Sequence, residues 1–123
     1  AAVFIAMNTQ GRAGEEQAAR FLTARGWRIL EKNYAAPCGE IDLIALDGKT
    51  LVFVEVKARA YSAFGGPLAA VTPAKQRRIA QTAALYVAGK RLKFDSIRFD
   101  VVCILPDKTE LISHAFTPPR TTL

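Results

Sequence analysis

Two acidic residues and one lysine interrupt the most apolar stretches of the chain. Asp42 lies in EIDLIAL (40–46), and Glu55 and Lys57 lie in TLVFVEVKA (50–58). Glu and Lys are rarely fully buried unless they are paired or functional. Two carboxylates on adjoining strands could share one small cation, and hard carboxylate oxygens suit Mg²⁺ or Mn²⁺ rather than zinc.

Such an ion could polarise a phosphoryl oxygen and lower the pKa of a bound water, which would make a hydroxide nucleophile near neutral pH. Lys57 would lie beside that water, where it could orient the nucleophile or stabilise the negative charge that grows on the phosphoryl group. Asp42, Glu55 and Lys57 together therefore predict phosphodiester hydrolysis. The alternative is a Glu55–Lys57 pair on a solvated face, with Asp42 in a local capping role.

The acidic residues meet only if the turn between their strands has the right length. Asp47-Gly48 between two apolar runs is a strong hairpin signal. A two-residue loop at these positions would pair Asp42 with Phe53 and Glu40 with Glu55, and Asp42 would then be diagonal to Glu55. A loop with an odd number of residues would send the two carboxylate sets to opposite faces of the sheet.

The elements that must position these residues follow the order α-β-β-β-α-β-β. Helical spacing predicts helices over 12–25 and 74–88, the second capped by Thr72 and opened by Pro73. Apolar β-branched runs predict strands over 27–34, 40–46, 50–58, 97–105 and 110–116. This order predicts an α/β fold with a mixed central sheet and flanking helices.

The chain is one domain in length, which we expect to span residues 11–117 with flexible termini at 1–10 and 118–123. No apolar run approaches the roughly 18 residues that cross a bilayer, so we expect no membrane partner. The two cysteines are far apart, and with a single His they cannot form a finger-type zinc site. We therefore expect reduced thiols in a cytoplasmic protein.

The positive charge of the chain lies in its second half. Residues 57–123 hold eleven Lys and Arg against four Asp and Glu, whereas residues 1–56 hold six against seven. Clustered positive charge suggests a polyanion partner, because each neutralised phosphate releases counterions. The residues that we expect to face phosphates are Arg59, Lys75, Arg77, Arg78, Lys90 and Arg91.

The ordered blocks of the chain resemble those of the YraN family of uncharacterised bacterial proteins. That family is similar to archaeal Holliday-junction resolvases and to the restriction-endonuclease-like nuclease superfamily. The resemblance covers roughly residues 11–117, and the matching blocks are Gly14-Glu15 with Ala18 and Leu22, GEIDLIA (39–45), VFVEVKAR (52–59), Lys75-Gln76 with Ile79, and RFDVV (98–102).

The resemblance implies a restriction-endonuclease-like core and a metal-dependent endonuclease that hydrolyses DNA, with branched DNA as a candidate substrate and a homodimer as a candidate assembly. It implies that Asp42 and Glu55 are ligands of Mg²⁺ or Mn²⁺, with the Val56 carbonyl completing the site. It also implies that Lys57 is the catalytic lysine. Further site residues that it implies are Glu15 from the first helix, Glu40 from the GEID block and Gln76 at the start of the second long helix.

Two alternatives to the enzyme stay open. The first is a nucleic-acid-binding module that has the fold without turnover, and the second is a basic protein-interaction subunit. The charge asymmetry fits all three hypotheses, but only the enzyme needs Asp42, Glu55 and Lys57 together.

Overall fold

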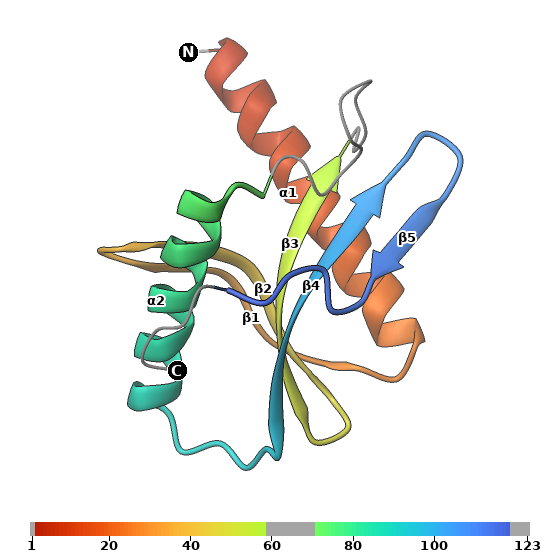
Figure 1. Ribbon diagram of the computed structural model, residues 1–123. Coiled ribbons are helices and arrows are strands. Elements are labelled where there is room, and N and C mark those ends of the chain that lie inside the picture. The colour runs from red at the N-terminus through yellow and green to blue at the C-terminus, as the bar shows by residue number, and fades with distance from the viewer. Residues whose placement is uncertain (1, 59–70, 119–123) are drawn as a thin grey trace.

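The computed structural model describes residues 2–58 and 71–118, with side chains from residue 13 onward, and within them two helices flank one five-stranded sheet (Figure 1). The elements in chain order are α1 (Ala2–Ala24), β1 (Arg28–Ala36), β2 (Gly39–Asp47), β3 (Thr50–Ala58), α2 (Pro73–Gly89), β4 (Ser96–Ile104) and β5 (Thr109–Ile112). This order confirms the predicted α/β fold class and is consistent with a restriction-endonuclease-like core. Neither helix of the described part has the length and apolar character that a membrane crossing needs.

The strands lie in the sheet in the order in which they follow one another along the chain. Strands β1, β2 and β3 form antiparallel pairs, β3 and β4 are parallel, and β5 is antiparallel to β4. The parallel pair requires a crossover connection. Helix α2 is part of that crossover, and Lys75 in its first turn contacts Glu55 near the carboxyl end of β3.

Strand β3 is buried on both faces. Phe53 packs with Ile79 of α2 in one apolar cluster, whereas Val52 and Val54 pack with Leu22 of α1 in the other. The two helices therefore cover opposite faces of the sheet (Figure 1). This alternation directs Glu55, two residues after Phe53, toward α2.

The β2–β3 hairpin has the predicted two-residue loop, but the loop lies one position later than expected. Asp47 pairs with Thr50, so Gly48 and Lys49 form the turn, and Gly48 has a φ of 60°. Glycine at the first central position of a two-residue loop is the arrangement of a type II′ turn. The predicted pairings of Asp42 with Phe53 and of Glu40 with Glu55 were therefore wrong, because Phe53 pairs with Ile44 and Val54 with Leu43.

Helix α1 begins at Ala2, ten residues before the predicted start. The segment before residue 12 contains alanines and no proline, so nothing in it ends a helix, and an internal glycine costs only about 1 kcal/mol. Gly26, with a φ of 92°, follows the helix as expected. The predicted flexibility of the termini stays a prediction.

Candidate active site

Strands β2 and β3 separate at Asp42. Their pairing is regular from the turn up to Leu43 and Val54. The next residue of β2 is Asp42, whose Oδ2 accepts a hydrogen bond of 2.8 Å from the backbone N–H of Val56. The carboxylate thus takes the place of a backbone partner and lies against β3.

Gly39, the first residue of β2, packs closely against α2. A Cβ atom at Gly39 would lie 3.0 Å from Thr82 Oγ1 and 3.5 Å from the Arg78 carbonyl oxygen. A side chain at this position would press on the Thr82 hydroxyl group, so glycine allows the close approach. This contact fixes the β1–β2 hairpin against α2 and closes one side of a pocket beside Asp42.

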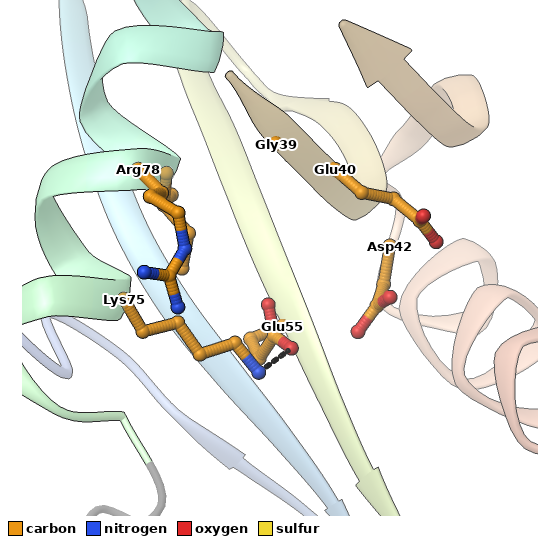
Figure 2. A pocket seen from close by; sticks show the side chains of 7 residues that line it. Gly39, Glu40, Asp42, Glu55, Lys75 and Arg78 are labelled. Carbon is orange, nitrogen blue, oxygen red and sulfur yellow. Dashed lines mark ion pairs between the residues drawn. The ribbon is translucent and has the colours of Figure 1, made fainter. Parts of the chain in front are cut away.

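Glu55 lies in this pocket between two lysines. Its side chain is 8% exposed, and its Oε1 atom is 2.9 Å from Lys75 Nζ and 3.8 Å from Lys57 Nζ. Figure 2 shows Lys75 reaching from α2 to Glu55, with the Asp42 carboxylate on the other side of Glu55. Two carboxylates, from Asp42 and Glu55, thus lie close to the ammonium groups of Lys57 and Lys75.

The local sequence explains how Lys75 arrives there. Thr72 is the N-cap of α2, and its Oγ1 accepts a hydrogen bond of 3.2 Å from the backbone N–H of Lys75. Pro73 opens the helix, where its missing N–H costs nothing. The cap fixes the first turn of α2 near the carboxyl end of β3, and Lys75 extends from that turn to Glu55.

Asp42 has a strongly perturbed pKa. Burial and the nearby Glu55 raise its pKa from 3.8 to about 7, with a smaller contribution from Glu15, while the hydrogen bond from Val56 acts in the opposite direction. Asp42 therefore exchanges its proton near neutral pH. A cation beside the two carboxylates would favour the ionised form of Asp42 and replace that proton.

The two lysines differ in their acidity. Burial, assisted by the neighbouring Lys75, lowers the pKa of Lys57. Burial also acts to lower the pKa of Lys75, but the hydrogen bond to Glu55 and the surrounding negative charge raise it overall. Lys75 therefore stays an ammonium ion, whereas Lys57 gives up its proton more readily than an ordinary lysine.

The pocket has a volume of about 230 Å³. One water molecule takes about 30 Å³ of the liquid, so the space is sufficient for a hydrated ion. Glu40 and Arg78 stand at its wall with the acidic pair (Figure 2). The residues that line it are Gly39, Glu40, Asp42, Glu55, Lys75, Arg78 and Ile79.

The residues fit a divalent cation of the magnesium type. Among the side chains that the structure describes, no group of three or more His, Cys, Asp and Glu is placed to hold a metal ion. Mg²⁺ is commonly bound through one or two carboxylates, with waters and substrate phosphates as its other ligands. Asp42 and Glu55 provide that number of carboxylates, provided that the Lys75 ammonium group leaves Glu55.

Three further residues that the family resemblance implied lie at different distances from this centre. Glu15 is half-buried on α1 and is close enough to Asp42 to affect its pKa. Gln76 is turned toward the start of α2, where its Nε2 atom donates to the Val71 carbonyl at 3.0 Å, and it does not line the pocket. Val56 contacts the site through its N–H, and the role of its carbonyl stays a prediction.

The expected phosphate-facing residues do not form one group. Arg77 and Arg78 are exposed near the start of α2. Lys90 follows the other end of that helix, with its Nζ 3.9 Å from Glu31 Oε2, and Arg91 is exposed beside it. Lys75 lies in the acidic pocket instead of on an outer surface, and Arg59 lies outside the described residues.

The position of Lys75 is the feature that sequence reasoning missed. A signal for it was present, because a helix that connects two parallel strands begins near the carboxyl end of the first. The capping sequence Thr72-Pro73 fixes where α2 begins. Together these features place the first turn of α2 close to Glu55.

Comparison with known proteins identifies relatives along nearly the whole chain. The model of a family described as "Uncharacterised protein family UPF0102" matches residues 14–104. A UPF0102 protein of Geotalea daltonii is 52% identical over 113 residues, which cover 88% of this chain and 89% of the relative. UPF0102 protein STH1475 of Symbiobacterium thermophilum is 50% identical over 111 residues, which cover 86% of this chain and 94% of the relative.

A third relative, a UPF0102 protein of Alkalilimnicola ehrlichii, is 46% identical over 110 residues, which cover 89% of this chain and 87% of the relative. These matches confirm the predicted kinship with a family of uncharacterised bacterial proteins. The similarity to resolvases and other nucleases stays a prediction.

Proposed function

The chain belongs to the uncharacterised protein family UPF0102, and from its acidic pocket we propose that it is a Mg²⁺- or Mn²⁺-dependent endonuclease that hydrolyses DNA phosphodiesters. One observation carries the proposal. Asp42 and Glu55 come together where β2 and β3 separate, and their proximity and burial raise the pKa of Asp42 to about 7. Two crowded carboxylates repel each other at a cost to the fold, and a bound cation would remove that repulsion.

Three residues of the pocket and the adjacent Lys57 have a part in this reaction. Asp42 and Glu55 would hold the ion, which would supply Lewis-acid activation of a phosphoryl oxygen and of water. Lys57 lies beside Glu55 and has a lowered pKa, so it can accept a proton from the attacking water or donate a hydrogen bond to the charged phosphoryl group. Arg78 at the pocket wall binds a backbone phosphate.

The DNA substrate is proposed from exposed positive charge, and the homodimer from the family resemblance. The exposed Arg77 and Arg78 suit contact with a phosphate backbone and provide no dedicated set of base-reading side chains. Branched DNA and a homodimer are proposed from the resemblance to resolvases, because a two-fold junction calls for two active sites. Both cysteines of the described part are free thiols, and on this ground we propose a cytoplasmic location.

The test compares cleavage of junction, flap and linear DNA in Mg²⁺, in Mn²⁺ and in EDTA. We expect the Asp42→Asn protein to lose metal-dependent cleavage while it still binds DNA. The matched control is Asp95→Asn, because Asp95 is exposed and lies beside Lys49, at the opposite end of β3 from the pocket. Equal cleavage by the wild-type and Asp42→Asn proteins would remove the enzyme proposal.

A second candidate is a nucleic-acid-binding module of the same fold without turnover. The ion pair between Glu55 and Lys75 favours it, because this pair already neutralises the carboxylate that the enzyme needs. Salt-dependent binding of DNA without cleavage under any of these conditions would select this candidate. DNA binding that barely responds to salt would instead favour a protein-interaction subunit.

A further inference from the structure

Lys75 holds a positive charge at the place where a divalent ion would meet Glu55. We propose that Lys75 is an exchangeable counter-ion, which neutralises Glu55 in the metal-free protein and transfers to a DNA phosphate oxygen when a divalent ion binds. This inference rests on the proposed function and adds to it a mechanism by which metal and DNA binding are coupled. No bond is made or broken in the exchange, because ion pairs alone are rearranged.

The geometry provides a fixed carboxylate and a movable ammonium group. The side chain of Glu55 is 8% exposed, whereas that of Lys75 is 30% exposed. The backbone of Lys75 is fixed, since its N–H donates to the N-cap Thr72. Its ammonium group, however, is a compact point charge on a flexible stem of four carbons. The tip can therefore leave Glu55 while the helix stays in place.

The charges of the pocket require such a movement. When Asp42 is ionised, its charge and that of Glu55 are balanced by the ammonium groups of Lys57 and Lys75. A divalent ion added to this balanced set leaves an excess of positive charge in a partly buried space. A DNA phosphate reduces that excess, and the released Lys75 is close enough to the pocket to pair with it.

Arg78 is the other cation of the pocket, one helical turn beyond Lys75. Among the described residues Arg78 has no ion pair, so its guanidinium group can meet a phosphate without first leaving a carboxylate. Lys75 must break an ion pair to do so. Lys75, unlike Arg78, can therefore make the affinity for DNA depend on the metal. By reciprocity it also makes the affinity for the metal depend on DNA.

The test measures Mn²⁺ affinity by calorimetry for the wild-type, Lys75→Gln and Lys49→Gln proteins. Lys49 is an exposed cation in the β2–β3 turn, at the opposite end of β3, so Lys49→Gln removes the same charge far from the pocket. We expect Lys75→Gln to bind Mn²⁺ about tenfold more tightly, because a hydrogen bond to a charged group contributes about that factor to an equilibrium constant. Lys49→Gln should bind Mn²⁺ as the wild-type protein does.

The coupling is measured with a phosphorothioate DNA junction that resists cleavage. In the wild-type protein the junction should tighten Mn²⁺ binding, and in Lys75→Gln this effect should be largely lost. Lys75→Arg keeps the charge, so its Mn²⁺ affinity should stay near that of the wild-type protein. This variant also separates the loss of charge from a loss of folding.

Two results would contradict different parts of the account. If Lys75→Gln binds Mn²⁺ no more tightly than the wild-type protein, although Asp42→Asn abolishes that binding, Lys75 is not an exchangeable counter-ion and the metal site stands. If the wild-type protein binds no Mn²⁺ that depends on Asp42, the metal-dependent function itself fails, and the exchange fails with it.

Discussion

The stability of the Asp42→Asn protein distinguishes a functional carboxylate from a structural one. Burial and Glu55 raise the pKa of Asp42 from 3.8 to about 7 in the folded protein. The folded state therefore binds the Asp42 proton more tightly than the unfolded chain does. The contribution of Asp42 to the free energy of unfolding should therefore be largest below about pH 4 and should fall as the pH rises toward 7, since the folded state must then hold an unfavourable charge.

The size of this effect follows from the change in pKa. A rise from 3.8 to about 7 corresponds to about 4 kcal/mol of stability lost above pH 7. Because the neighbouring charge of Glu55 accounts for part of this rise, we expect about half of it, ~2 kcal/mol, to come from the burial of Asp42 alone. Asn cannot ionise, and its Oδ1 can still accept the hydrogen bond from Val56.

The assay is urea unfolding in EDTA at pH 4 and pH 8. Asp42→Asn should be about 2 kcal/mol more stable than the wild-type protein at pH 8 and nearly equal to it at pH 4. Asp95→Asn, the exposed control, should match the wild-type protein at both pH values. When EDTA is replaced by Mn²⁺ at one hundred times its Kd, the wild-type protein should be stabilised by about 2.7 kcal/mol. The stability of Asp42→Asn should not change.

A lower stability of Asp42→Asn at pH 8 in EDTA would refute this reasoning. It would mean that the ionised carboxylate serves the fold, through its hydrogen bond to Val56, and that no cation is needed to accommodate it.

Three further substitutions test other parts of the structure. Lys57→Met should reduce DNA cleavage by about a hundredfold or more, because Lys57 is proposed to act on the proton of the attacking water. Mn²⁺ binding should be retained and not weakened, since the variant removes a positive charge 3.8 Å from Glu55; single-turnover cleavage and calorimetry measure the two effects. Asp100→Asn should cost about 3 kcal/mol in urea unfolding, because Asp100 is fully buried and accepts hydrogen bonds from Arg98 Nε and the His114 N–H. Thr72→Ala should cost about 1 kcal/mol in the same assay, because it removes the N-cap of α2.

Each of these substitutions has an outcome that contradicts its argument. Cleavage by Lys57→Met at the wild-type rate would exclude the lysine from the reaction. An Asp100→Asn protein as stable as the wild-type would show that the buried pair contributes nothing net. Unchanged unfolding of Thr72→Ala would mean that α2 is held by its packing and not by its cap.

The sequence predicted the acidic site because local patterns decide its main features. Alternation along β3 places Glu55 on the face of Phe53, and the two-residue turn brings β2 beside it. The turn was expected one position too early, yet the acids still meet. Moving both turn residues by one position changes the pairing by two residues, and a change of two keeps every side chain on its face.

Lys75 was predicted to face a phosphate, and its ion pair with Glu55 was not predicted, because local patterns do not show what a side chain meets across the fold. Lys75 is polar, precedes an arginine-rich turn and has ordinary helical spacing. Its contact with Glu55 depends on the parallel pairing of β3 and β4, which fixes where α2 crosses the sheet. The early start of α1 escaped prediction for a different reason, because helices without a stop signal extend as far as propensity allows.

Calorimetric titration with Mn²⁺ at pH 8 and pH 6 tests the central claim, that Asp42 and Glu55 form a cation site. The account predicts binding at pH 8 that is abolished by Asp42→Asn and by Glu55→Gln and unchanged by Asp95→Asn. The affinity should be about tenfold weaker at pH 6, because Asp42, with a pKa of about 7, must lose its proton to bind the ion. Equal Mn²⁺ affinity in the wild-type and Asp42→Asn proteins, or no binding by either, would contradict the claim.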